Sequence, residues 1–351
     1  MNKELSRKFT IISFISMVLV VILHANNLVI NLSSGNIIVP KGYNSFIQDF
    51  FTQGIARIAV PIFFIISGYL YFLNSKGTYS EFKSKISKRI KSILIPYLVW
   101  SCWGLVFYMI LQSLPMAENF FTNGLIKDMA IEEILKILFF NPLPYQLWFL
   151  RDLMILVTIS PILFFAIKYL KELAILLAFI PWISSYFYGF INTDSLLFFM
   201  LGGYLAIFDK LVNLEGGKYA CWLFSLWILL VITNSILLFQ GISIHNTWMS
   251  IFNKITLLIG VVAIWFIYDQ LHGNAHIKAF NPIFSFSFFL YAFHEPVLTM
   301  VKKGLFFVLG NIQIISFSVY ILAPLLTIFL SLSVGFLVKK HIPRIYKIAT
   351  G

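Results

Sequence analysis

Runs of about 20 apolar residues recur along the whole 351-residue chain. A membrane-spanning helix needs about 20 consecutive, mostly apolar residues. Charged residues make up 11% of the sequence, whereas a soluble domain carries about 25%. The sequence therefore predicts an all-α, polytopic membrane protein, with residues 1–351 as a single integral-membrane domain. We place about ten transmembrane helices at residues 9–30, 54–73, 90–112, 147–167, 173–191, 195–208, 219–239, 251–271, 283–301 and 314–338.

Two segments depart from the spanning pattern. Residues 195–208 are short for a span and contain Gly202-Gly203, so this helix is expected to be broken or tilted. Residues 130–140, AIEEILKILFF, have apolar positions at helical spacing but are too short to cross a bilayer. We expect them to form an amphipathic helix on the membrane surface, within an outer loop at residues 113–146.

The distribution of basic residues sets the orientation of the chain. Most of the 26 Lys and Arg residues fall in loops on one side if the N-terminus lies inside. The positive-inside rule then predicts cytoplasmic N- and C-termini. It also explains the net charge of +12 without a nucleic-acid partner. The first apolar run is not followed by a small-residue cleavage site, so we expect it to be retained as a helix.

Ionisable residues inside the predicted spans are costly in a bilayer and tend to be functional. With a rise of 1.5 Å per residue, those on five different helices reach the outer half of the membrane. This convergence predicts a polar cavity that opens outward. The residues are His24, Arg57, Arg151 with Asp152, Lys254, and His294 with Glu295.

Structural explanations for the same residues stay open. Arg151 and Lys254 lie close enough to the interface for their side chains to reach the lipid headgroups. Glu295 could pair with Arg57 or His294 and so lower its burial cost. His24 could be a packed histidine bonded to a neighbouring helix, or a neutral imidazole that accepts a proton near pH 7.

A second basic cluster faces the predicted cytoplasmic side. The stretch KSKISKRIKSILIPY, residues 83–97, places Lys88, Arg89 and Lys91 just before the third span. The cluster could be a topology signal that also attracts anionic membrane lipid. It could equally bind a phosphate-rich cytosolic ligand, and composition does not separate the two interpretations.

Metal and disulfide chemistry are not indicated by the sequence. The two cysteines, Cys102 and Cys221, both lie inside apolar segments, which is neither a disulfide framework nor a metal-ligand spacing. The histidines also lack ligand spacing with one another. We therefore expect no metal site.

Five stretches, in order along most of the chain, resemble motifs of the membrane acyltransferase-3 family. They are VLVVILHAN (18–26), ARIAVPIFFIISGYLY (56–71), KRIKSILIPYLVW (88–100), YQLWFLRDLMI (145–155) and FFLYAFHEPVL (288–298). The family includes bacterial O-acetyltransferases of polysaccharides and the membrane domain of the vancomycin-resistance serine racemases. Two positions depart from its pattern: Ser13 replaces a basic residue eleven positions before His24, for which Arg7 or Lys8 could substitute, and Ser92 replaces a second arginine.

The resemblance implies an acyltransferase in the bacterial inner membrane. Its donor would be acetyl-CoA, held on the cytoplasmic side by Arg89 with Lys88 and Lys91. The acceptor would be a hydroxyl of an extracytoplasmic glycan or lipid-linked sugar. By resemblance His24 is the catalytic base. Substrate or oxyanion contacts are expected from Arg57, Trp148, Arg151, His294 and Glu295.

Other functions compete with this one. A polysaccharide or small-molecule exporter or flippase would also have about ten helices and an interior rich in aromatic residues, which make up 18% of this chain. A transporter needs polar groups along a continuous path, whereas here they gather in the outer half with a separate basic cluster inside. A sensory or partner domain is a third interpretation. The acceptor, the acyl group and the oligomeric state are not indicated by the sequence.

Overall fold

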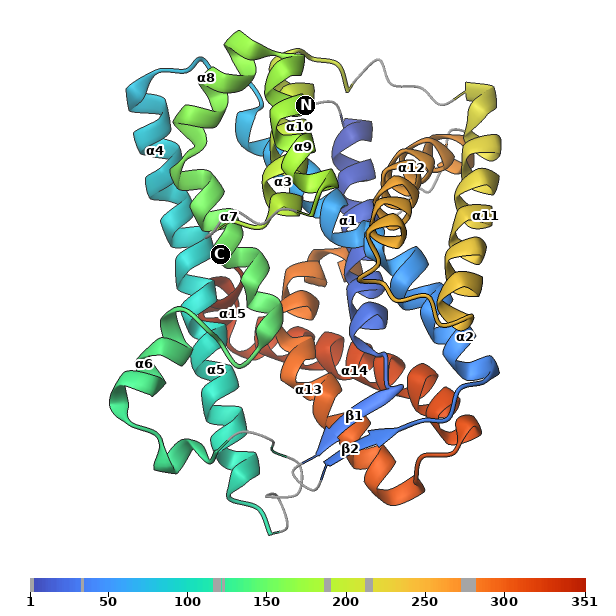
Figure 1. Cartoon of the computed structure of the whole chain (residues 1–351). Coiled ribbons are helices and arrows are strands. Elements are labelled where there is room, and N and C mark those ends of the chain that lie inside the picture. Colours follow the sequence, from blue (N-terminus) through green and yellow to red (C-terminus); the bar gives the residue numbers. More distant parts are fainter. Residues whose placement is uncertain are drawn as a thin grey trace. The chain divides into compact units, whose positions relative to one another are not determined.

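The computed structural model describes residues 3–32, 35–115, 121, 124–185, 191–211, 217–272 and 282–351 (Figure 1). Within these residues, seven helical runs are long and apolar enough to cross a membrane. The prediction of a helical membrane protein is therefore confirmed, while ten spans and cytoplasmic termini stay predictions. The seven runs are Lys3–His24, Tyr43–Phe72, Tyr79–Gln112, Gly217–Phe239, Thr247–Leu271, Ile283–Leu309 and Gln313–His341.

Several of these runs combine more than one kind of helix. The second contains α2 (Tyr43–Asp49), a π-helical turn at Phe50–Gly54, a 3-10 turn at Ile55–Ile58 and α3 (Ala59–Phe72). The third contains α4 (Tyr79–Arg89), a π-helical turn at Ile90–Leu94 and α5 (Ile95–Gln112). The other long helices are α1 (Lys3–His24), α11 (Ala220–Phe239), α12 (Thr247–His272), α13 (Ser287–Leu309) and α14 (Gln313–His341).

Two of the predicted spans are wrong as single straight helices. The span predicted at 147–167 consists of α7 (Trp148–Thr158) and α8 (Ser160–Leu170), bent by 65° at Ile159. Pro161, at the start of α8, lacks the backbone N–H that would continue α7. The span predicted at 173–191 is shorter, since α9 (Glu172–Ile183) ends eight residues early; residues 186–190 lie outside the described part.

Of the two alternatives for the helix with Gly202-Gly203, the break is wrong, and the tilt stays a prediction. α10 (Thr193–Ile207) is a continuous helix that runs against α3. A Cβ atom on Gly202 would lie 2.0 Å from the carbonyl oxygen of Ile65, and one on Gly68 would lie 2.1 Å from that of Phe199. The glycines therefore allow the two backbones to approach closely, as small residues do between membrane helices.

The predicted amphipathic segment is confirmed as a helix. α6 (Ile131–Phe139) lies after a 3-10 turn at Ile126–Asp128 and exposes Ile131, Leu135 and Phe139. Its position on a membrane surface stays a prediction. The C-terminus adds a further short helix, α15 (Pro343–Thr350), against α5, where Trp100 Nε1 donates to the Ala349 carbonyl at 2.8 Å.

The chain is organised as two compact units, each made of three separate stretches. Unit 1 comprises Met1–Val20, Asp49–Arg89 and Asp152–Ser285; its helices α3 and α10 contact each other, as do α11 and α12. Unit 2 comprises Val21–Gln48, Ile90–Arg151 and Phe286–Gly351, in which α13 lies along α14.

The end of α1 corrects the first predicted span. The helix stops at His24, and an antiparallel hairpin of β1 (Val29–Leu32) and β2 (Gly35–Ile38) follows. Asn26 Oδ1 accepts the Leu28 N–H at 3.2 Å, which favours a turn over further helix. Asn27 is completely buried, and its side chain bonds to Ser316 and Gln48.

Asn27 belongs to a buried network of side-chain amides in unit 2. Its Nδ2 donates to the Ser316 carbonyl at 3.0 Å, and Gln48 Nε2 donates to Asn27 Oδ1 at 2.7 Å. Asn44 Nδ2 donates to the Ser316 hydroxyl at 2.7 Å. Because each of these buried groups finds a partner, the network fixes the chain immediately after His24 against α2 and α14.

Candidate active site

His24 is the last residue of α1, and its side chain is half-buried. The ring of Tyr145 stands edge-on to the imidazole, with centroids 4.8 Å apart and an interplanar angle of 88°. The imidazole of His294 stacks beside it at 5.5 Å and 16°. The two histidines predicted from separate helices are therefore neighbours in unit 2.

Lys302 fixes the backbone at the end of α1. Its ammonium donates to the carbonyl of His24 and, at 3.1 Å, to the carbonyl of Asn26. The last carbonyls of a helix lack intrahelical partners and carry partial negative charge. A cation there both satisfies these oxygens and holds the His24 backbone in place.

The second histidine lies next to an interruption of α13. Glu295 has φ −109° and ψ 137°, which is not helical, and Pro296 follows it. Pro296 has no N–H to donate to the Ala292 carbonyl one turn earlier. Gln146 replaces that donor: its Nε2 donates to the carbonyls of Ala292 at 3.1 Å and Glu295 at 3.2 Å.

We expect the Gln146→Leu variant to lose about 1–3 kcal/mol of stability, because it leaves two buried carbonyls without a donor. Gln146 is itself 2% exposed, so water cannot easily replace its amide. The measurement is the thermal unfolding midpoint of detergent-solubilised protein. Gln240→Leu, at an exposed glutamine after α11, serves as the matched control. Equal midpoints for the two variants would contradict the proposed support of α13.

The hydrogen bonds of His294 define which nitrogen of its neutral ring carries the proton. The side chain is completely buried, and Nδ1 lies 2.6 Å from the Tyr291 carbonyl and 3.2 Å from that of Leu290. Both neighbours are acceptors, so Nδ1 carries the proton. Nε2 then holds a lone pair, and it has no hydrogen-bond partner within the described part of the chain. The neutral ring thus offers an acceptor at Nε2.

The Glu295 carboxyl is held within the same cluster. The Tyr145 hydroxyl donates to Oε1 at 3.3 Å, and the Thr299 N–H donates to Oε2 at 3.3 Å. The Lys302 ammonium also acts on it electrostatically. Glu295 is 1% exposed, and these two hydrogen bonds hold its carboxyl in place at the interruption of α13.

Trp148 and Arg151 lie on α7 in unit 2, and both side chains are half-buried. Trp148 contacts Phe149, whose ring meets that of Tyr291 at 5.8 Å. Arg151 acts electrostatically on Tyr97 of α5. Their predicted roles as substrate contacts stay predictions.

A second polar cluster belongs to unit 1. Arg57 is exposed just after the π-helical turn, and its Nε donates to Gln53 Oε1 at 3.1 Å. The Asp194 carboxyl at the start of α10 accepts a hydrogen bond from Trp182 Nε1. The positive charges of Lys254 and Arg57 interact favourably with this carboxyl. Unit 1 therefore contains a cluster of charged side chains, Arg57, Asp194 and Lys254. Arg57 is one of the site residues that the sequence predicts.

Lys254 and Asp152 have structural partners in unit 1. The Lys254 ammonium donates to the Trp182 carbonyl at the end of α9, and to the Ser185 hydroxyl at 2.6 Å, and so caps that helix. Asp152 is completely buried; it accepts from the Ser195 hydroxyl at 2.7 Å and from the Asn192 N–H at 3.4 Å. A carboxylate at the beginning of α10 is stabilised by the helix dipole.

The predicted donor cluster lies within a continuous helical run. Lys88 and Arg89 end α4, Lys91 lies in the π-helical turn, and all three side chains are exposed. The helical run begins at Tyr79, before the cluster, and the point at which it would enter a membrane stays a prediction. π-helical turns are rare in proteins, and those that occur often lie at functional sites. Because the three side chains are exposed, a soluble anion can reach their charges.

Lys8 is one of two residues that could substitute for the basic residue absent at Ser13, but its side chain is paired with Asp269. It is 5% exposed, and its ammonium bonds to both oxygens of Asp269 at 2.7 and 2.8 Å. The same ammonium lies 3.5 Å from the centroid of the Trp265 ring. Lys8 therefore serves the contact of α1 with α12.

The sequence did not identify Tyr145, Gln146 or Lys302 as members of the cluster. The predicted span ends at residue 301, directly before Lys302, whereas α13 continues to Leu309. Tyr145 and Gln146 begin the motif YQLWFLRDLMI. Their positions directly before the tryptophan are the signal that could have suggested a role.

Comparison with known proteins identifies the family to which the chain belongs. A family model described as an acyltransferase domain matches residues 10–338. The succinoglycan biosynthesis protein ExoH of Rhizobium meliloti (strain 1021) is 22% identical over 316 residues, which cover 88% of this chain and 83% of the relative. No solved structure matches the chain significantly. The match over nearly the whole sequence, together with the helical fold, establishes that this chain belongs to the acyltransferase-3 family.

Proposed function

We propose that the protein is a membrane O-acyltransferase. It would move an acetyl or other short acyl group from cytosolic acyl-CoA to a hydroxyl of an extracytoplasmic glycan or lipid-linked sugar. Family membership supports the transferase class, and the relative that is named for succinoglycan biosynthesis supports a polysaccharide acceptor. The observation that carries the proposal is His24, held at the end of α1 beside the imidazole of His294.

In the proposed reaction His24 acts as the general base. An imidazole nitrogen takes the proton of the acceptor hydroxyl as its oxygen forms a bond to the thioester carbonyl carbon. The carbon–sulfur bond then breaks, and the proton leaves with the thiolate as CoA thiol. His294 Nε2, as a buried acceptor, suits orientation of the hydroxyl more than stabilisation of an oxyanion, which requires a donor. Arg57, Trp148 and Arg151 are proposed contacts to the substrates by family resemblance.

The donor site is proposed at Lys88, Arg89 and Lys91. We expect Arg89→Ala to weaken acetyl-CoA binding about tenfold, equal to about 1.4 kcal/mol, because one charge-assisted contact to phosphate is removed. Titration calorimetry on detergent-solubilised protein measures this. Lys83→Ala, an exposed lysine on the same helix, should bind like the wild type.

Equal binding by the Arg89 and Lys83 variants would assign the cluster to topology and lipid attraction instead. If the wild-type protein did not bind acetyl-CoA at all, the donor would be excluded, and an exporter or flippase would become the better explanation.

A further inference from the structure

Access to His24 depends on which of the neighbouring side chains are exposed. The side chains of His294, Glu295 and Gln146 are at most 2% exposed. The side chain of Tyr145 is 46% exposed, and its ring centroid lies 4.8 Å from that of the His24 imidazole. A molecule that presents a hydroxyl to His24 must touch the exposed atoms beside it. The ring of Tyr145 is therefore a surface that such a molecule meets.

The hydroxyl of Tyr145 has a partner inside the protein. It donates to Glu295 Oε1 at 3.3 Å, while Oε2 of the same carboxyl accepts from the Thr299 N–H. A phenol has a single proton to donate. The hydrogen bond thus helps to hold the ring in place, and the part of Tyr145 that is left for a ligand is the apolar surface of its ring.

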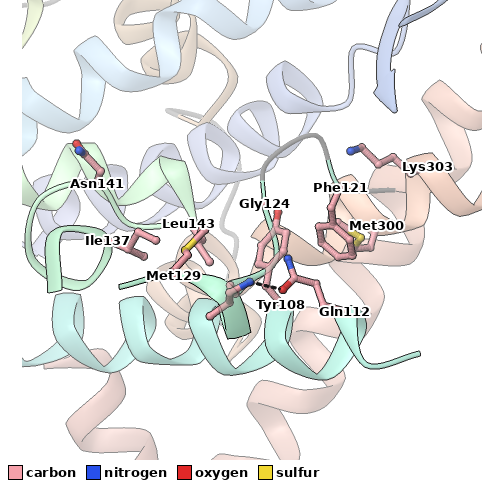
Figure 2. Close-up of a pocket in the computed structure, with 11 residues that line it drawn as sticks. Tyr108, Gln112, Phe121, Gly124, Met129, Ile137, Asn141, Leu143, Met300 and Lys303 are labelled. Atoms are coloured by element: carbon pink, nitrogen blue, oxygen red, sulfur yellow. Dashed lines mark hydrogen bonds between the residues drawn. The ribbon is translucent and has the colours of Figure 1, made fainter. Parts of the chain in front are cut away.

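The segment that carries Tyr145 is fixed on both sides. Pro144 packs on Gly104 of α5, where a Cβ atom would lie 2.2 Å from the Pro144 Cγ. Before it, Leu143 lines a separate cavity of about 370 Å³ (Figure 2). After it, Gln146 is bonded to α13 through both its side chain and its backbone carbonyl. A side chain that is already held in place loses little freedom when a ligand binds, which favours affinity.

An exposed and fixed aromatic ring beside a proposed general base matches the chemistry of a sugar. A pyranose ring has faces made of C–H groups, and packing one of them on an aromatic ring removes apolar surface from water. The hydroxyls project from the rim of the sugar. A pyranose that packs on Tyr145 therefore brings its rim, and with it a hydroxyl, toward His24.

We propose that the ring of Tyr145 is the surface on which the acceptor sugar packs, which makes Tyr145 a specificity-determining residue for a pyranose acceptor. Its role in acceptor recognition rests on the proposed transferase function. The binding of a pyranose next to His24 requires no acyl transfer and is measured without it.

The test is binding of methyl β-D-glucoside to the full-length protein, measured by saturation-transfer difference NMR. The protein is kept in an amine-oxide detergent, because the sugar headgroup of a maltoside detergent would compete. H1, H3 and H5 of the glucoside lie on one face of the ring, and H2 and H4 lie on the other. We expect one of these faces to receive more saturation than the other. Glycerol, which has hydroxyls but no apolar ring face, should bind more weakly.

Tyr145→Leu should weaken glucoside binding about tenfold, which corresponds to about 1.4 kcal/mol, and should abolish the difference between the two faces. Tyr145→Phe keeps the ring and should retain most of the affinity. Tyr43→Leu, at a tyrosine of α2 that is 50% exposed, is the matched control and should bind like the wild type. The thermal unfolding midpoint of each variant checks that it is folded, and Tyr145→Met replaces Tyr145→Leu if the latter does not fold.

Four results would overturn the proposal: no binding of the glucoside, equal saturation of its two faces, equal binding of glycerol, or an unchanged affinity in Tyr145→Leu. A loss in Tyr145→Phe as large as that in Tyr145→Leu would assign the effect to the hydroxyl and so reject the role of the ring. Acetyl-CoA binding and its dependence on Arg89 do not involve Tyr145, so they report separately on the proposed transferase function.

Discussion

The His24→Ala variant is expected to lose acyl transfer by about 10²–10⁴-fold, the usual contribution of a general base. It should still fold, because the side chain is only half-buried and lies at the end of α1. The backbone carbonyl that accepts from Lys302 is also retained. The measurement is the release of CoA thiol from acetyl-CoA in membranes that contain the acceptor glycan.

The control for this variant is His245→Ala, at an exposed histidine between α11 and α12. It should transfer acyl groups at the wild-type rate. Acetyl-CoA binding should be the same in both variants, since the donor site is proposed elsewhere. Full transfer activity in His24→Ala would remove this residue from the mechanism.

The largest effect on stability is expected from Gly202→Ala. The new Cβ atom would lie 2.0 Å from the Ile65 carbonyl oxygen, and 2.8 Å from the Tyr69 nitrogen. Both neighbours are backbone atoms of α3, so no side-chain rotation relieves the overlap, and the two helices must move apart. Overpacking of this kind costs about 1–3 kcal/mol or more. The thermal midpoint in detergent and the yield of folded protein measure the loss.

Gly304→Ala is the matched control, because a Cβ atom at Gly304 meets no atom within 4 Å. In a helix this change should be neutral or stabilising, since alanine is the better helix former. If Gly202→Ala were as stable as Gly304→Ala, the close approach of α3 and α10 would not be the reason for the glycines.

Local sequence patterns predicted the helices well but not all of their ends. The bend between α7 and α8 has a visible signal in the sequence, the proline at position 161. The end of α1 is different: Asn27 is fixed by Ser316, which lies 289 residues later. A polar residue near the end of an apolar run does not reveal which distant group will bond to it.

The candidate site shows the same limit. The depth of His24 and His294 in their spans correctly suggested that they converge, and their rings lie 5.5 Å apart. Gln146 could not be recognised, because its role depends on the Ala292 carbonyl that Pro296 leaves without a helical donor. Lys254 was open to two interpretations; its ammonium caps α9, and its level in a membrane stays a prediction.

The Lys8 ammonium forms an ion pair with Asp269, whose side chain is 41% exposed. The two residues are separated by 261 positions, so α1 is synthesised long before α12 can supply the carboxylate. Until α12 is made, water or lipid headgroups are the available partners of the Lys8 ammonium, which directly precedes the span predicted to begin at residue 9. The contact of α1 with α12 can therefore form only late in the synthesis of the chain.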